Sequence, residues 1–352
     1  MLYTGIDYHK RYSVVCTLDA EGQRVQSARI DQNEPAAFAA YFQRLPAPSR
    51  TVVEACWNWG WLYDLLGELP GVAAVVLAHP GKTRLIAEAQ IKTDRLDAEK
   101  LATLLRGNLV AEAHASPPAV RARKYVLRQR VYWVRMRTRL RNRVHALLAR
   151  QRQIEPPACS DLFGKKGLQW LRTLALPAPD GLLLQQSLAG FEQLTAQIKA
   201  LEAAILAENQ RDPAAARLQT LPGVGAILAA VIATEIDGQA RFCRPEKLCA
   251  YAGLVPTTHA SGGKVHHGRL LPFCNEWLRW AFIEAAWSAA SGFSSLGALY
   301  RRHRAQGKPG AKAITIVARR LCRIAWHLLH EQRNYTPNPP RPVLSPAAPA
   351  IY

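Results

Sequence analysis

The sequence has no long apolar run and no signal-peptide pattern. No apolar stretch reaches the ~20 residues that a membrane-spanning helix needs. The N-terminal segment MLYTGIDYHKRYS carries charges where a signal peptide would have an uninterrupted apolar core. The chain is therefore expected to stay inside the cell and to have no membrane partner.

Paired cysteine motifs are absent as well. The seven cysteines are scattered and none forms a C-x-x-C pair, which argues against a zinc finger and a thiol redox site. An odd number of cysteines in a chain of this size is typical of reduced, mostly buried thiols. No internal repeat is visible, which leaves repeat architectures unsupported.

Acidic residues are few relative to basic ones. Lys and Arg number 46 against 26 Asp and Glu, and the formal net charge is +20. A cation of this size attracts polyanions, so nucleic acid is the expected partner, with a merely basic or ribosome-associated protein as the alternative. With 352 residues and 49% hydrophobic residues, the chain can form two domains with ordinary cores.

The first 112 residues have the pattern of an α/β domain. Three expected antiparallel strands precede a strand–helix–strand–helix order, which is the order of a ribonuclease-H-like domain. The expected strands are Leu2–Ile6, Ser13–Leu18, Gln23–Ile30, Thr51–Cys56 and Val72–Ala78, and the expected helices are Trp57–Leu69 and a segment from Thr93 onward.

Residues 121–154 contain no acid and an apolar stripe, which predicts a basic amphipathic helix. Such a helix can lie along phosphates; a membrane-surface helix or a solvated face is the alternative. Its basic residues are Arg121, Arg123, Lys124, Arg128, Arg130, Arg135, Arg137, Arg139, Arg141, Arg143, Arg150 and Arg152.

Later segments are mainly helical. Leucines, isoleucines and one phenylalanine at steps of three and four between Leu184 and Ile205 predict a coiled-coil helix, which is either a dimer seam or an intramolecular packing helix. The sequence LPGVG at Leu221–Gly225 resembles a helix-hairpin-helix turn, whose glycines let backbone amides approach a phosphate; a simple helix connection is the alternative. The Pro-rich end is expected to be disordered.

Four carboxylates are candidate metal ligands. Asp7 ends the first strand, and Glu54 follows two valines in another. Asp94 and Asp97 are three positions apart and share one face of a helix. Carboxylate oxygens suit Mg²⁺, and two ions ~4 Å apart can activate a nucleophile and stabilise the leaving oxygen of a phosphodiester. Singly, they could instead be a turn residue, a buried ion pair, and helix N-terminal charges capped by Thr93.

Ser261 is a candidate nucleophile on phosphorus. It precedes Gly262 and Gly263 in an expected flexible loop, with Lys264 and Arg269 nearby to stabilise charge. On the residues alone a Ser-Gly turn is the favoured reading. The adjacent His266 and His267 are read as phosphate contacts or surface residues.

The combined motifs resemble the DEDD-type insertion-sequence transposases of the IS one-ten family, with its IS eleven-eleven branch, and the related Piv-type DNA invertases. The order of the pieces is specific, although each piece alone is not. The matching pieces are GID at Gly5–Asp7, VVEA at Val52–Ala55, His79-Pro80, KTDRLDA at Lys92–Ala98, LPGVG, and the AGLVP…SGG…LR pattern from Ala252 to Arg279.

The resemblance implies four regions. Residues 1–112 would form a RuvC-like catalytic domain, and residues 113–212 the basic helix and coiled coil. Residues 213–335 would form a mainly α-helical C-terminal transposase domain with the helix-hairpin-helix-like motif, and residues 336–352 a disordered tail. Phe273-Cys274-Asn275 departs from the basic residue and Gly-Asn that the family often has, which leaves the local loop open.

The resemblance also implies a function. Asp7, Glu54, Asp94 and Asp97 match the tetrad that binds Mg²⁺, and Ser261 matches a serine that forms a covalent phosphoserine with DNA. The chain would then be a DNA transposase that recombines donor and target DNA, guided by a bridge RNA, as a homo-oligomer (dimer or tetramer). It would act in the bacterial cytoplasm, associated with the nucleoid. Expected nucleic-acid contacts are Arg121, Arg123, Lys124, Arg128, Arg130, Arg135, Arg139, Arg143, Lys264 and Arg269. A junction resolvase that uses the acids alone, and a non-catalytic nucleic-acid scaffold, are the alternatives.

Overall fold

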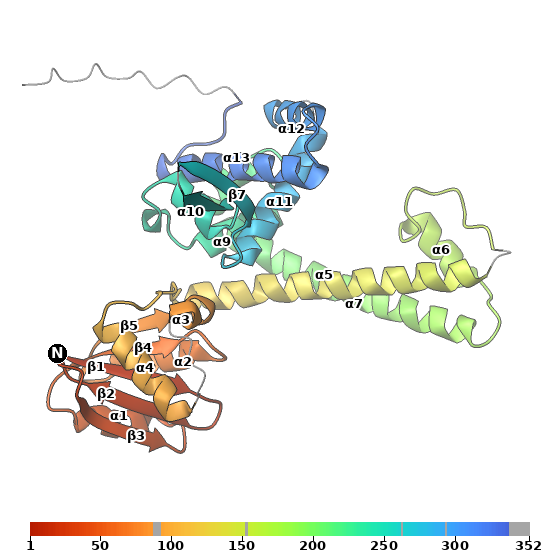
Figure 1. The fold of residues 1–352 in the computed structure, drawn as a ribbon. Coiled ribbons are helices and arrows are strands. Elements are labelled where there is room, and N and C mark those ends of the chain that lie inside the picture. The colour runs from red at the N-terminus through yellow and green to blue at the C-terminus, as the bar shows by residue number, and fades with distance from the viewer. Residues whose placement is uncertain (87–92, 152–153, 262, 293, 338–352) are drawn as a thin grey trace, which may run out of the picture. The chain divides into compact units, whose positions relative to one another are not determined.

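The computed structural model describes residues 1–86, 93–151, 154–261, 263–292 and 294–337 (Figure 1). Lys92, Arg152 and Gly262, which the sequence analysis singles out, lie outside these residues, as does the Pro-rich segment from 338. The chain divides into two units, Met1–Pro118 and Ala119–Tyr352. Within the described residues, no helix has the length and apolar character needed to cross a bilayer.

The first unit is built on a five-stranded mixed sheet in the order β3-β2-β1-β4-β5. β1 is antiparallel to β2, and β2 is antiparallel to β3, whereas β4 runs parallel to both β1 and β5. The expected strands are therefore all present, with small shifts at their ends. Their bounds are Leu2–Tyr8 (β1), Ser13–Leu18 (β2), Arg24–Ile30 (β3), Ser49–Glu54 (β4) and Val72–Ala78 (β5).

Each face of the sheet is covered by helices because side chains alternate along the strands. On one face, Ile6 and Val53 pack with buried side chains of α1 (Pro35–Gln43) and α2 (Trp59–Glu68). On the other face, α4 (Asp94–Arg106) lies across β1 and β2. Helix α1 was not expected from the sequence, and neither was α3 (Pro80–Ile86), where His79-Pro80-Gly81 was interpreted only as the end of the preceding strand.

The second unit begins with a long antiparallel helical hairpin of α5 (Pro118–Arg150) and α7 (Asp180–Asn209), with α6 (Lys165–Thr173) between them in sequence (Figure 1). Hydrogen bonds and ion pairs fix the direction, because the paired positions move oppositely along the two helices. These pairs are Arg123 with Asn209, Arg130 with Glu202, and Arg150 with Asp180.

The hairpin is held by two clusters of buried side chains. Leu184, Leu188 and Phe191 of α7 pack with the C-terminal part of α5 and with α6, while Ile205 joins the core of the C-terminal helices. Most of the heptad-like positions are therefore buried within one copy of the chain. The structure thus favours the intramolecular packing helix over a dimer seam at these positions.

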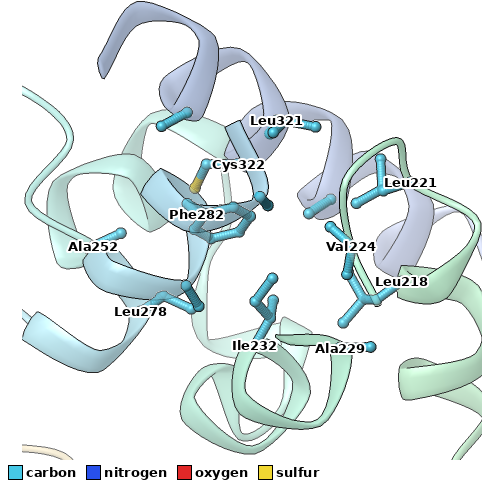
Figure 2. Close-up of a cluster of buried hydrophobic side chains, with 14 of the residues drawn as sticks. Leu218, Leu221, Val224, Ala229, Ile232, Ala252, Leu278, Phe282, Leu321 and Cys322 are labelled. Carbon is cyan, nitrogen blue, oxygen red and sulfur yellow. The ribbon is translucent and has the colours of Figure 1, made fainter. Parts of the chain in front are cut away.

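The C-terminal helices share one core with the start of α5 and the end of α7. Figure 2 shows its buried side chains gathered around Phe282, which is fully buried. Gly223 in the LPGVG turn belongs to this packing, because a side chain there would collide with the backbone of α11 at Ala285 and Ala289. The helices are α8 (Pro213–Gln219), α9 (Ala226–Ile236), η1 (Gln239–Arg241), α10 (Pro245–Tyr251), α11 (Glu276–Ser291), α12 (Ser295–Ala305) and α13 (Gly310–His330).

A β-hairpin stands out from these helices, formed by β6 (Pro256–Ser261) and β7 (Lys264–Leu270). Ser261 pairs with Lys264 at its tip, and Gly263 has a positive φ of 74° that suits glycine. A flexible loop was predicted here from the sequence, and that prediction was wrong, because the two segments pair as a hairpin. Two β-prone segments flanking Gly-Gly are a hairpin signal, and the expectation of a loop overlooked it.

Candidate active site

Asp7 and Glu54 lie at the carboxyl ends of two neighbouring parallel strands. The register pairs Ile6 of β1 with Val53 of β4, and both acids come one residue later. Because Ile6 and Val53 face α1 and α2, the next side chains face α4. Two acids far apart in the sequence are thereby brought to the same edge and the same face of the sheet.

Helix α4 brings the other two acids over this edge. Thr93 caps the helix by accepting a hydrogen bond from the amide of Leu96, and Asp94 and Asp97 occupy the first turn. The capping interpretation is thus correct, and it is compatible with a ligand role because both side chains stay partly exposed. Asp97 also forms an ion pair with Lys100 at 3.1 Å, one turn further along the helix.

Gly5 allows α4 to pack closely against β1 because it has no side chain. It faces α4 from β1, two residues before Asp7. A Cβ at this position would lie 2.5 Å from the amide nitrogen of Ala102 and even closer to the carbonyl oxygen of Ala98. The GID motif therefore has a physical basis, since its glycine admits the helix backbone and its aspartate then meets the acids of that helix.

Three of the four acids open on one cleft. Asp7, Glu54 and Asp97 line a hollow of ≈ 350 Å³, together with Arg84 of α3 and Lys100 of α4. Acidic and basic side chains thus face the same space. Such a set can hold a divalent cation on its carboxylates and a phosphate on its cationic groups.

Asp94 is joined to the cluster through His9. The His9 Nε2 atom lies 3.0 Å from Asp7 Oδ2 and 3.7 Å from Asp94 Oδ1. Tyr12 stacks on the His9 ring and donates a hydrogen bond of 2.9 Å to Asp94 Oδ2. Ligand atoms of Asp7, His9 and Asp94 all lie within 4.8 Å of one another, which is close enough for a shared metal ion.

The pKa of Asp7 is shifted by its burial and by the neighbouring charged groups. Burial raises the pKa of its carboxyl above the ordinary value, and the charges of Asp94 and Asp97 raise it further, while His9 opposes both. A carboxylate that is costly to ionise in a partly open cleft is typical of functional sites. A bound divalent cation would remove that cost, so the donor set fits a hard metal ion with oxygen ligands.

Ser261 lies in the other unit, at the exposed tip of the β6–β7 hairpin. Lys264, which pairs with Ser261 across the hairpin, is exposed on β7, and so is Arg269 further along that strand. The hairpin geometry therefore presents a hydroxyl beside cationic side chains on a protruding element. That arrangement is compatible with a nucleophile, and equally with a residue of a tight turn.

Several basic side chains of α5 form ion pairs with acids of the same chain. Arg123 pairs with Asp212 at 2.7 Å, and Arg130 pairs with Glu202 at 2.5 Å. These two arginines were expected to contact nucleic acid, but the structure turns Arg130 toward an acid within α7 and Arg123 toward an acid that follows α7. Arg121, another expected contact, lies partly buried near the start of the helix.

A buried acid anchors α5 to the C-terminal core. The side chain of Glu235 in α9 is 4% exposed and lies 3.1 Å from Arg128 and 3.5 Å from Lys124. Asn275 donates a 2.8 Å hydrogen bond to the same carboxylate and also caps α11 by accepting from Leu278. The local departure at Phe273-Cys274-Asn275 is therefore a helix start, with Asn275 as its cap.

The remaining expected contacts are exposed. Arg135, Arg139 and Arg143 point outward from α5, and none of the three forms an ion pair within the described part of the chain. They stay available to an external polyanion, as do Lys264 and Arg269 of the β6–β7 hairpin.

Four residues that lie near the acids were not predicted from the sequence: Arg84 and Lys100 line the cleft, and His9 and Tyr12 contact Asp7 and Asp94. His9 and Tyr12 follow Asp7 closely, and Lys100 follows Asp97 by three residues, so proximity to the acids was the available signal. Arg84 lies in α3, a helix that was not expected, so its position could not be inferred.

Two models of transposase families match separate parts of the chain. Residues 4–152 match a family model described as a transposase of the DEDD IS110 type. Residues 215–301 match a second model, described as the transposase IS116/IS110/IS902 family. The first match contains all four acids and α5, and the second contains the LPGVG turn, Ser261 and α11.

Curated relatives extend over nearly the whole chain. A probable family 20 transposase of Pseudomonas aeruginosa is 25% identical over 95% of this chain and 94% of its own length. An uncharacterized protein of the insertion element IS116 of Streptomyces clavuligerus is 24% identical over 96% and 97%. A putative transposase of Sinorhizobium fredii is 29% identical over 76% and 71%. Two family models in the same order and full-length relatives agree with the resemblance seen in the motifs, and the chain belongs to the IS110 family of DEDD transposases.

Proposed function

We propose that this transposase is a Mg²⁺-dependent, RNA-guided DNA recombinase that cuts and rejoins donor and target DNA through a phosphoserine intermediate. The observation that carries the proposal is the cleft where Asp7, Glu54 and Asp97 meet Arg84 and Lys100. Membership of a transposase family makes DNA the substrate and implies a divalent metal. The choice of Mg²⁺, the number of ions, the guide RNA and the serine step belong to the proposal.

The sheet order supports a ribonuclease-H-like catalytic unit. Three antiparallel strands, with two parallel strands added beside the first, give the order that the sequence pattern suggested. In this arrangement the carboxyl ends of β1 and β4 are adjacent and α4 crosses them. The acids thus come from the two central strands and from one helix.

Each side chain then has a role. Asp7, Glu54, Asp94 and Asp97 would hold two divalent ions, which supply Lewis-acid polarisation of the scissile phosphate when bound. Arg84 and Lys100 would hold non-bridging phosphate oxygens by charge. His9, hydrogen-bonded to Asp7 and supported by the Tyr12 ring, would fix the orientation of that carboxylate.

Ser261 would attack phosphorus. Its Oγ forms a new ester bond as one bond from phosphorus to a deoxyribose oxygen breaks; the serine gives up its proton and the leaving oxygen gains one. Attack on this phosphoserine by a hydroxyl of another strand would restore the serine and rejoin the DNA. Exposure of Ser261 at a hairpin tip supports its access to a bulky substrate.

The decisive experiment is recombination of a donor–target plasmid pair in the presence of Mg²⁺ and RNA from the flanks of the element. Wild-type protein is expected to yield junctions, and Asp97→Ala and Ser261→Ala are expected to yield none. Asp31→Ala, an exposed acid outside the cleft, and Ser291→Ala, an exposed serine at the end of α11, are the matched controls. Covalent protein–DNA adducts are expected with wild type and to be lost with Ser261→Ala.

Other outcomes would point elsewhere. Strand cleavage that survives Ser261→Ala but not Asp97→Ala would favour a junction resolvase that uses the acids alone. Full activity of Asp7→Ala and Glu54→Ala would favour a non-catalytic nucleic-acid scaffold. Recombination that persists after nuclease removal of all RNA would refute the guide.

A further inference from the structure

The outward face of α5 alternates arginine with exposed tyrosine. Tyr125, Arg128, Tyr132, Arg135, Arg139 and Arg143 follow one another at steps of three and four residues, so they form one stripe along the helix. This set is called the Arg–Tyr stripe below. Leu127 and Val131 of the same helix are buried, whereas every member of the stripe except the partly buried Arg128 is exposed.

The two tyrosines are unusually exposed for aromatic residues. Tyr125 is 68% exposed and Tyr132 is 51% exposed. Phosphate binding uses cationic groups and at most the tyrosine hydroxyl, and leaves the ring faces without a role. An aromatic face held beside guanidinium groups is instead the chemistry on which unpaired bases stack, while the cations follow the backbone.

A third ring lies beside the stripe. Trp277 of α11 has the Arg128 guanidinium 5.4 Å and the Arg135 guanidinium 5.8 Å from its ring centroid. Arg128 is further held by the buried carboxylate of Glu235 at 3.1 Å. The stripe is thus fixed to the C-terminal core at its middle, which reduces the entropy lost when a ligand binds.

The spacing of the rings suits a stacked strand. Seven residues of α-helix place Tyr125 and Tyr132 about 10.5 Å apart along the axis. At about 3.4 Å per stacked nucleotide, that distance corresponds to roughly three steps of a single strand.

We propose that the Arg–Tyr stripe binds an unpaired segment of nucleic acid, with bases stacked on Tyr125 and Tyr132 and phosphates held by Arg135 and Arg139. This deepens the proposed function, because it assigns a strand-binding surface to a recombinase that must hold single strands. A second copy of the chain is the less suitable occupant, since a helix without any acid would place arginines against arginines.

The test compares aromatic with aliphatic replacements in the full-length protein. The double variants Tyr125→Leu/Tyr132→Leu and Tyr125→Phe/Tyr132→Phe are titrated with labelled single-stranded RNA, single-stranded DNA of the same sequence, and the DNA duplex. The leucine variant is expected to bind single strands roughly 10- to 100-fold more weakly. The phenylalanine variant is expected to bind as wild type does, because the stacking face is kept. The RNA and DNA arms show which strand the stripe prefers.

The salt dependence of binding distinguishes the contribution of the tyrosine rings from that of the arginines. Arg135→Gln/Arg139→Gln is expected to reduce the slope of log K against log salt by about 0.7 for each phosphate that the variant no longer neutralises, whereas the leucine variant keeps the wild-type slope. Undiminished single-strand binding by the leucine variant would overturn the proposal. An equal loss on the duplex, or a dissociated oligomer with unchanged binding, would also overturn it. These binding readouts do not depend on Asp97 or Ser261, so failure here is distinguishable from failure of the proposed catalysis.

Discussion

Gly5→Ala is expected to disable the acidic cluster without touching a carboxylate. The added methyl group would meet the Ala102 amide nitrogen at 2.5 Å, where ordinary contact begins at 3.4 Å. It would lie even closer to the carbonyl oxygen of Ala98. These two atoms belong to the backbone of α4, so neither can rotate away. The helix must therefore retreat from β1 by about 0.9 Å or more at this point, the difference between those two distances.

A retreat of this size is large for a metal site. Ligand distances in working sites agree to about 0.2 Å, so moving Asp94 and Asp97 away from Asp7 by several times that amount breaks shared coordination. Overpacking of this kind also costs about 1–3 kcal/mol of folding stability. The expected result is a protein that still folds, unfolds at a lower temperature, and binds Mg²⁺ or Mn²⁺ at least tenfold more weakly.

Calorimetric titration with Mn²⁺ and thermal unfolding measure both effects. Gly67→Ala is the matched control, because nothing lies within 4 Å of a side chain at that position of α2. It is expected to stabilise the protein by about 0.5–1 kcal/mol through helix propensity and to leave metal binding unchanged. Wild-type metal affinity in Gly5→Ala would refute the idea that this glycine sets the distance between the acids.

Two further predictions concern buried charge. Asp7→Asn is expected to raise the unfolding temperature of the metal-free protein at neutral pH, because burial raises the pKa of this carboxyl. With Asp7 present, the protein loses stability as the pH rises from 3.8, the ordinary pKa of the carboxyl, through the raised pKa of the folded state. The stability gained with Asp7→Asn should therefore vanish below pH 3.8, and an equal gain at low pH would contradict this reasoning. Glu235→Gln is expected to cost about 3–5 kcal/mol, since it removes the buried carboxylate that forms ion pairs with Lys124 and Arg128. Glu192→Gln, in an ion pair that is about half exposed, should cost about 0–1 kcal/mol in the same denaturation assay, and similar losses in both variants would show that burial is not the cause.

The fold of the first unit was largely predictable because its strands carry strong local signals. Apolar runs of β-branched residues at Ser13–Leu18 and Val72–Ala78 were located without error. Helix α1 (Pro35–Gln43) was missed although a proline stands at its start. Its helical pattern is short and alanine-rich, and its stability comes from burying Phe38, Tyr41 and Phe42 against the sheet, which a local pattern does not reveal.

The acids could be chosen from the sequence, but their arrangement could not. Asp7 and Glu54 were selected because an ionised group at an apolar strand is costly. In the structure, His9 connects Asp7 to Asp94, and Asp94 does not line the cleft shared by the other three acids. Both features depend on strand register and on the close approach of α4 to β1. Register is a property of the assembled sheet, so single-strand patterns cannot supply it.

The basic helix shows most clearly where a composition argument needs the structure. A stretch without acids was interpreted as one cationic surface, yet its charges are divided between two tasks. Arg130 is neutralised by an acid within α7, Arg123 by an acid just beyond α7, and Arg128 by the buried Glu235, so these charges hold the second unit together. Arg135, Arg139 and Arg143 form no ion pair among the described residues and are exposed. A polyanion therefore meets fewer charges than the sequence counts, and the salt dependence of its binding should reflect that smaller number.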